Sequence, residues 1–328
     1  MFVFGFVLMI IKILCILNIT ITFAKKNNNM NVLSLFDGLS CGQIALNRAG
    51  IKYDNYYASE IKPHAIMCTN GNYPKTKQLG DVRNINYTKI GIEVDLTPSH
   101  VRFIEDDIHL FLAGSPCKGI SRLNKNQEGL EHPESKLFYE AVRVLREIQI
   151  ENPDVYFLFE NTHGNKEATK IITETLGVMP ISINSRLVSA QNRPRYYWTN
   201  IPGIKQPNDK GVTTKDVFEF NGQIADKCRI DWLTNESGKK SIEKGYTRVN
   251  PYPKSGCLTA NGHKKWNENY LFKDGTYHYL SQNELEKLQT LPIGYTSMLN
   301  YDEAYDCIGD GWTVDVIAHI LSFLPKLE

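Results

Sequence analysis

Short apolar runs alternate with amphipathic segments of helical length from residue 30 to about residue 200. Such runs, bounded by turn residues, predict buried strands, whereas the longer segments with apolar positions three or four apart predict helices. The strand candidates are 32–36, 55–59, 108–113 and 155–159, and the helix candidates are 41–49, 62–70, 137–149 and 165–176. The alternation predicts an α/β fold, with a mostly parallel sheet and helices on both faces.

The pattern changes after residue 200. Residues 201–280 are rich in Gly, Pro, Asn and Lys, show short broken strands and no long helix, and hold 13 Lys and Arg against 9 Asp and Glu. Helical periodicity returns at 281–290, where Ser281 and Glu284 have the spacing of a capping box, and again at 312–324. This change in composition and pattern predicts a second, smaller and basic domain.

Residues 1–23 are almost wholly apolar and precede the sequence AKKNNNM. A membrane span, a signal sequence and an over-extended gene model with its true start at Met30 all fit this pattern. We favour the last, because NVLSLF directly after Met30 reads as the first core strand and leaves no linker. Residues 1–29 are then a non-native extension or apolar leader, and we expect a cytoplasmic protein without stable membrane association.

Composition narrows the class only a little. Apolar content of 42%, charged content of 22% and a net charge of +1 describe an ordinary globular protein that would hold a polyanion through a local patch. The seven cysteines form no C-x-x-C pair, which argues against a zinc site or a disulfide framework. We therefore expect no metal.

Acidic residues follow the predicted strands at the edge where open α/β sheets bind ligands. The first strand runs into FDGLSCG, with Gly38 in a tight turn, the second ends at Glu60, and Asp81 lies in the next loop, GDVRNI. Carboxylates at successive strand ends suit the hydroxyls and amine of a nucleoside and would repel a pyrophosphate. Capping of helices is the alternative role for Glu60 and Asp81.

The apolar run LFLA leads into Gly-Ser-Pro-Cys. Proline fixes its own φ and biases the preceding residue toward extended backbone, so Pro116 ends the strand and aims Cys117 outward. That geometry suits a nucleophile, although from this stretch alone a buried structural thiol is the favoured interpretation.

Two further segments carry candidate chemistry. VYFLFEN ends in Glu160 and Asn161, a carboxylate emerging from an apolar strand that could either move a proton or close a salt bridge. In QNRPRYYW, Arg193 and Arg195 are two residues apart, which on a strand places both guanidinium groups on one face. Such a pair binds an anion or remains solvated.

Together these segments resemble the cytosine-5 DNA methyltransferase family from Met30 to the C-terminus. The motifs follow the family's order: FDGLSCG, YASE, GDVRNI, GSPC, SKLFYEAVRVL, FEN, QNRPRYYW, SGCLTA, ELEKLQTLPIGY and GDGWTVDV. GSPC with YASE and GDVR is most similar to the de novo branch. The resemblance implies a Rossmann-like catalytic domain at 30–200 and 276–328, and an inserted target-recognition domain at 201–275.

The resemblance also implies the chemistry. Cys117 would attack C6 of a flipped cytosine, Glu160 would hold and protonate the N3 edge, and Arg195 would orient Glu160, with Arg193 and Asn161 beside them. The arginines would supply the positive charge that a thiolate needs. The implied cofactor is S-adenosylmethionine, and its implied contacts are Phe36, Asp37, Gly38, Glu60, Ile61, Asp81, Val82, Pro116, Leu137, Asp310 and Trp312.

The chain departs from the family's usual residues at Lys118, Thr162 and Asp310. The implied partner is double-stranded DNA, bound by a monomer, with the polar loop 118–136 closing over it. Candidate DNA contacts in the target region are Arg229, Lys239, Lys240, Arg248 and Lys254. A methyltransferase acting on transfer RNA, and an inactive DNA-binding paralogue, remain alternatives, as does a role in restriction-modification.

Overall fold

The computed structural model describes residues 30–97, 100–121, 126, 128–260, 262–264, 266 and 268–325. The expectations for residues 1–29, and for part of the loop 118–136, lie outside the described residues. Met30–Leu324 forms one compact unit. Among the described residues, none of the helices has both the length and the apolar character needed to cross a bilayer.

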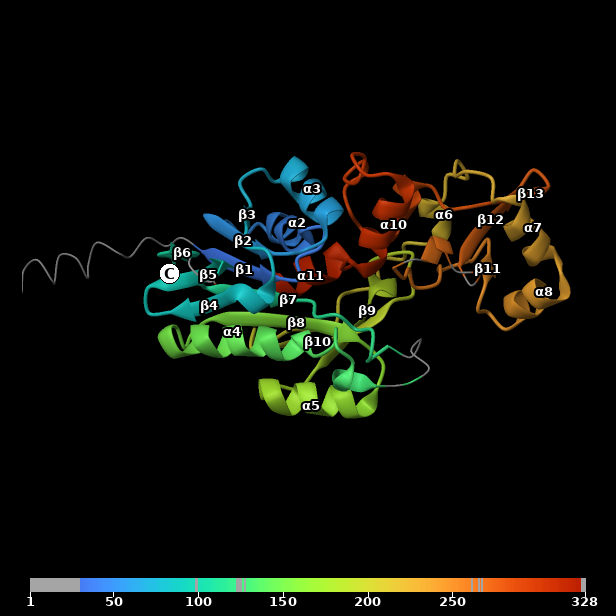
Figure 1. Ribbon diagram of the computed structural model, residues 1–328. Coiled ribbons are helices and arrows are strands. Elements are labelled where there is room, and N and C mark those ends of the chain that lie inside the picture. The colour runs from blue at the N-terminus through green and yellow to red at the C-terminus, as the bar shows by residue number, and fades with distance from the viewer. Residues whose placement is uncertain are drawn as a thin grey trace, which may run out of the picture. The chain divides into compact units, whose positions relative to one another are not determined.

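A seven-stranded sheet forms the centre of this unit (Figure 1). In spatial order its strands are β3 (Lys77–Gln78), β2 (Asn55–Ser59), β1 (Asn31–Leu35), β7 (Leu110–Ala113), β8 (Tyr156–Thr162), β10 (Pro194–Thr199) and β9 (Ile181–Asn184). The first five are parallel, whereas β10 runs antiparallel to both of its neighbours. The predicted α/β, Rossmann-like fold with a mostly parallel sheet is confirmed.

Helices cover both faces of the sheet (Figure 1). On one face lie α4 (Leu137–Glu151) and α5 (Lys166–Leu176), and on the other α2 (Cys41–Arg48), α3 (Pro63–Asn72) and α11 (Val314–Leu321). Side chains of successive residues in a strand point to opposite faces of the sheet. In β1, Val32 packs in the core under α2 and α11, whereas Leu33 packs in the core under α4. This period of two, with both faces buried, explains the nearly continuous apolar runs of the sequence.

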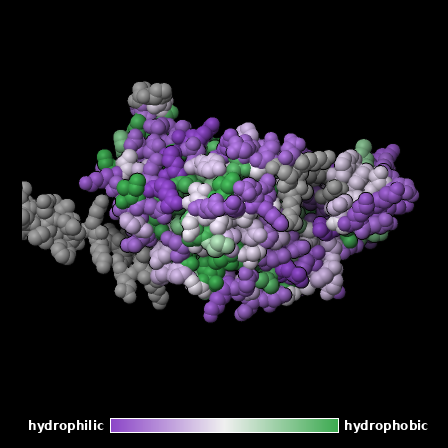
Figure 2. Space-filling model, turned by 90° about the horizontal axis from the view of Figure 1, so that it is seen from below, coloured by the Kyte–Doolittle hydropathy of each residue, from purple (hydrophilic) through white to green (hydrophobic). Residues whose placement is uncertain are grey.

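The C-terminal third contains a smaller sheet and several short helices. The sheet has the order β11 (Arg248–Val249), β12 (Asn269–Lys273) and β13 (Thr276–His278), and the helices are α6 (Thr214–Val217), α7 (Lys227–Thr234), α8 (Glu236–Glu243), α9 (Gln282–Leu288) and α10 (Tyr301–Asp310). The region at the right of Figure 2 shows a mostly hydrophilic surface, and the side chains of Lys239 and Lys240 on α8 are exposed.

The predicted elements agree with the observed ones to within a few residues, and the capping box of Ser281 and Glu284 is present. Several elements were missed, including β3, β9 and the short helices α6, α7 and α8. Two further omissions are larger. One is α10, which has its own capping box between Asn300 and Glu303. The other is a three-stranded antiparallel sheet of β4 (Ile85–Thr88), β5 (Gly91–Thr97) and β6 (His100–Ile104), inserted before β7.

Candidate active site

The chain reverses its direction of travel across the sheet at β1, which pairs with β2 on one side and with β7 on the other. In open parallel sheets the crevice at such a point, beyond the carboxyl ends of the strands, is where ligands bind. The turn after β1, Glu60 after β2, and the loop after β7 all lie at this edge. Backbone bonds from Asp37 N to Ser59 O (3.1 Å) and from Gly114 N to Leu35 O (3.5 Å) tie these strand ends together.

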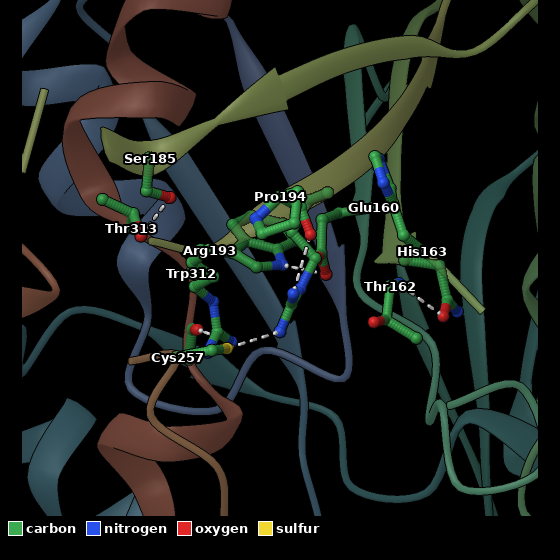
Figure 3. A network of polar contacts seen from close by, with 12 residues as sticks. Glu160, Thr162, His163, Ser185, Arg193, Pro194, Cys257, Trp312 and Thr313 are labelled. Atoms are coloured by element: carbon green, nitrogen blue, oxygen red, sulfur yellow. Dashed lines mark hydrogen bonds and ion pairs between the residues drawn. The ribbon is translucent and has the colours of Figure 1, made fainter. Parts of the chain in front are cut away.

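Glu160, near the end of β8, receives a donor on each carboxylate oxygen. Arg195 Nε lies 3.0 Å from Oε1, and the indole Nε1 of Trp312 donates to Oε2 at 3.0 Å. The side chains of Glu160 and Arg195 are only 11% and 13% exposed, so this ion pair is shielded from water. The structure therefore brings together Glu160 and Arg195, as the resemblance implies, and adds Trp312 to them. Figure 3 shows Glu160 and Trp312.

Trp312 can reach Glu160 because the residue directly after β7 is a glycine. A Cβ on Gly114 would lie 2.8 Å from Nε1 of Trp312, which is closer than real Cβ contacts come. Any larger residue at this strand end would therefore push the indole away from the carboxylate. The sequence interpretation gave Trp312 only to the cofactor.

Asn161 fixes the loop that carries the thiol. Its Nδ2 donates to both the carbonyl and the hydroxyl oxygen of Ser115 at 3.2 Å, joining β8 to the segment that leads to Pro116 and Cys117. Pro116 and Cys117 are themselves half-buried.

Burial raises the pKa of the Cys117 thiol, the Arg195 guanidinium opposes this rise, and the Glu160 carboxylate adds to it. The two arginines favour the thiolate, as expected, but burial outweighs them and the pKa of Cys117 is raised.

Arg193 lies one residue before β10 rather than on it. Its guanidinium and that of Arg195 nevertheless reach the same sulfur, that of Cys257, so the two groups lie on one side as their spacing predicts. Arg193 is 3% exposed, and its guanidinium donates to the carbonyl oxygens of Leu258 (2.7 Å), Gly309 (3.1 Å) and Gly311 (2.9 Å). It therefore ties together chain segments that lie far apart in sequence, instead of facing a ligand.

The turn after β1 contains a buried acid with a free oxygen. Asp37 is 9% exposed, its Oδ1 accepts a bond from Tyr56 at 2.8 Å, and its Oδ2 accepts none from the described residues. Burial raises the pKa of Asp37 to about 6, against the opposing effect of nearby hydroxyls. An unsatisfied buried acceptor at a ligand crevice indicates that a donor arrives with the ligand.

Glu60 is held by backbone amides. Its Oε2 accepts from Gly38 N at 2.8 Å, and its Oε1 accepts from the N–H groups of Ile61 (2.7 Å) and Lys62 (2.9 Å). Gly38 has φ +56°, and a Cβ placed on it would meet nothing within 4 Å, so open space adjoins the turn. Ile61 is 64% exposed directly beside the carboxylate, an apolar surface available to a flat ring.

The remaining predicted cofactor residues divide into two groups. Phe36 (φ +57°) and Leu137 are half-buried, and Val82 is buried in the core. Asp81 and Asp310 are instead paired with cations: Arg83 Nε lies 3.0 Å from Asp81 Oδ1 and Oδ2, and Lys62 Nζ lies 2.7 Å from Asp310 Oδ2.

The Arg83 pairing lowers the pKa of Asp81. A ligand amine that used either of these carboxylates would therefore share it with a side chain of the protein.

Cys257 lies in the SGCLTA segment, but the sequence did not predict it as a site residue. Its sulfur lies 3.4 Å from Nη1 of Arg193, which Figure 3 shows beside it, and 3.6 Å from Nη2 of Arg195. No local signal reveals this, because the contacts span more than sixty residues of sequence. Within the described ranges, no group of three or more His, Cys, Asp and Glu residues is placed to hold a metal ion.

A mostly parallel α/β sheet with a thiol after β7, a carboxylate on β8 and an arginine on β10, next to the crevice at its switch point, is typical of a Rossmann-like enzyme of group-transfer chemistry. The model of the C-5 cytosine-specific DNA methylase family matches residues 30–201, more than half of the chain, and the chain belongs to this family. The methyl donor of the family is S-adenosylmethionine.

Curated relatives include an orphan methyltransferase of Bacillus phage rho11s, 26% identical over 230 residues, which cover 66% of this chain and 39% of that protein. The DNA (cytosine-5)-methyltransferase DRM1A of Oryza sativa subsp. japonica is 30% identical over 128 residues, covering 37% of this chain and 25% of that protein. The matched part thus spans less than half the length of these relatives.

Solved structures share the fold. The methyltransferase EhMeth of Entamoeba histolytica superimposes with a TM-score of 0.67 at 15% identity, over 90% of this chain and 97% of that one. The Dnmt2 methyltransferase of S. pombe gives 0.63 at 17% identity, over 90% and 97% of the two chains.

Proposed function

We propose that the chain transfers a methyl group from S-adenosylmethionine to C5 of a flipped cytosine in double-stranded DNA. The observation that carries this proposal is the Glu160 carboxylate, held from two sides by Arg195 and Trp312 in the electrostatic reach of the Cys117 thiol. The family of the chain, and the methyltransferase names of its phage and plant relatives, favour a DNA substrate.

The residues at the switch point fit S-adenosylmethionine. Glu60 presents a carboxylate, already oriented by three backbone amides, to ribose hydroxyls, and Ile61 presents exposed apolar surface to the adenine. The unsatisfied Oδ2 of Asp37 and the open space at Gly38 suit the cationic part of the molecule. When bound there, S-adenosylmethionine supplies an electrophilic methyl group to C5 of the base.

The protein's own residues perform the remaining steps. The thiol proton of Cys117 passes by way of water to the Glu160 carboxylate, the sulfur bonds to C6, and the electron pair of the C5–C6 double bond becomes available at C5. Glu160 passes this proton on to N3, which neutralises the charge that would build on the ring, while Arg195 and Trp312 keep the carboxyl group in place. After methylation the C5 proton leaves to water, the C5–C6 double bond reforms, and the Cys117–C6 bond breaks with its electron pair on sulfur. N3 then returns its proton through Glu160 to the Cys117 thiolate.

Residues 201–275 are proposed to read the DNA target, because they contain a local excess of basic side chains. The monomeric state and the cytoplasmic location stay predictions. Transfer RNA is the competing substrate, and the experiment below decides between the two polymers.

The test measures transfer of a labelled methyl group from S-adenosylmethionine to duplex DNA and, separately, to structured RNA. We expect labelling of the DNA at cytosine C5, lost in Cys117→Ser and kept in Cys68→Ser, a matched substitution of a buried thiol on α3. Labelling of RNA and not of DNA would show that the substrate is RNA. Labelling by Cys117→Ser equal to that by wild type would show that Cys117 is not the nucleophile.

A further inference from the structure

The sulfur of Cys257 receives two guanidinium groups. Arg193 Nη1 lies 3.4 Å away and Arg195 Nη2 lies 3.6 Å away, and Cys257 itself is half-buried. Figure 3 shows Cys257 and Arg193 together beside Trp312 and Glu160. The C-terminal part of the chain therefore supplies a second thiol to the neighbourhood of the proposed active site.

Arg195 is held along its whole guanidinium edge. Nε faces Glu160 Oε1 at 3.0 Å, Nη1 donates to the Pro194 carbonyl at 2.9 Å, and Nη2 faces Cys257. A guanidinium is planar and rigid, so removal of one of these partners frees the group to rotate and changes the angle at which it meets the others. The position of the Glu160 carboxylate thus depends on the contact between Arg195 and the Cys257 sulfur.

The charges around this sulfur favour an anion. Arg193 is buried and the side chain of Arg195 is only 13% exposed. Glu160 pairs with Arg195, whereas the partners of Arg193 besides Cys257 are neutral backbone carbonyls. A third cation is close: a Cβ on Gly256 would lie 2.2 Å from Nη1 of Arg248, so that guanidinium packs on the residue before Cys257. Buried charges without a counter-ion are costly, and a thiolate at Cys257 would balance one of them.

The two thiols of this region titrate in opposite directions. The two arginines lower the pKa of Cys257 below its usual value despite burial, whereas burial raises the pKa of Cys117. The carbonyl of Leu258, 3.3 Å from the Cys257 sulfur, is the acceptor that a protonated thiol would use. The protonated and ionised forms therefore make different contacts, which an experiment can separate.

We propose that Cys257 is a thiolate that positions Arg195, and through it Glu160, for the reaction at the base. This inference rests on the proposed function for its catalytic consequence. Cys257 is a positioning residue, because it touches neither the base nor the methyl donor in this account.

The first experiment measures ionisation of the thiol in the wild-type chain without any substrate. The chain is alkylated with iodoacetamide over a range of pH, and the rate at each cysteine is read from peptide masses. We expect the midpoint of the Cys257 profile to lie below the midpoint of the Cys117 profile in the same sample. A Cys257 midpoint equal to or above that of Cys117 overturns the proposal.

The second experiment measures the consequence for the site. Cys257→Ser and Cys257→Ala should lower kcat roughly tenfold or more at neutral pH, with KM for duplex DNA changed less than about threefold. Cys257→Asp, which restores a negative charge, should recover much of the loss, and Cys68→Ser should behave as wild type. A serine variant with unchanged kcat, or an aspartate variant no better than alanine, would contradict the positioning role.

The third readout needs no turnover. The indole N–H signal of Trp312 in an NMR spectrum, assigned with Trp312→Phe, reports the hydrogen bond to Glu160. It should shift in Cys257→Ser and stay in place in Cys68→Ser. If wild type transfers no methyl group, the proposed function fails, whereas an unshifted Trp312 signal in Cys257→Ser would refute the positioning role by itself.

Discussion

Asp37 offers a direct test of how the site is built, because the structure buries a carboxyl group there without satisfying it. Asp37→Asn removes the charge and keeps the shape of the side chain. The acid has a pKa of about 6 in the folded chain against 3.8 without the surrounding protein. The folded state therefore resists ionisation of this group, and wild type loses stability as the pH rises from about 4 through about 6.

The size of the effect follows from linkage. A difference of about two pKa units lowers the unfolding free energy of wild type at pH 7 by about 3 kcal/mol, relative to its value at low pH. Asp37→Asn has no such loss, because its side chain does not ionise. Binding acts in the opposite sense, because a cationic ligand benefits from the charge. Asp37→Asn should therefore stabilise the free chain near neutrality and weaken its affinity for S-adenosylmethionine.

The assay is urea unfolding of both chains at several pH values between 4 and 8, with Asp54→Asn, an exposed acid before β2, as the control for loss of one charge. The difference in unfolding free energy between Asp37→Asn and wild type should grow with pH up to about 6 and then level off. A difference independent of pH, or one no larger than that of Asp54→Asn, would refute the argument that burial governs this carboxyl group.

Three further substitutions test other contacts. Trp312→Phe keeps a ring over Gly114 and removes the donor to Glu160, so kcat/KM should fall roughly tenfold in steady-state assays, as for a lost hydrogen bond to a charged group. Gly114→Ala should lower kcat/KM by at least the same factor, because its Cβ displaces the indole from Glu160. If either variant kept the wild-type kcat/KM, the indole would not be needed. Glu60→Ala should weaken S-adenosylmethionine roughly tenfold or more in calorimetric titration and leave DNA affinity unchanged, and an equal loss for both ligands would indicate misfolding.

The central sheet could be predicted because its signal is local. Each core strand is a short apolar run, and the turn residues that follow it, such as Gly38 and Pro116, indicate where the chain leaves the sheet. The helix α10 was missed although Asn300 and Glu303 carry a readable capping box, because acidic residues and tyrosines obscure its apolar positions. The small sheet β4–β6 was missed because β6 is largely exposed and shows no core pattern.

The sequence could indicate single site residues, but not the contacts between them. The meeting of Glu160 with Trp312 joins positions 152 residues apart, and nothing near either one signals it. Arg193 was placed on a strand from its spacing to Arg195, but the carbonyls that it binds come from distant segments. Cys257 acquires its chemistry entirely from those two arginines, so its role emerges only when the fold brings them together.

The most direct measurement of the central claim is capture of the covalent bond between the protein and the base. A duplex containing 5-fluorocytosine at target positions is incubated with the chain and S-adenosylmethionine, because fluorine at C5 cannot leave as a proton does. We expect a stable adduct of chain and DNA, dependent on the methyl donor, with the base attached to the peptide that contains Cys117. No adduct on any target sequence, or an adduct at another residue, would contradict it.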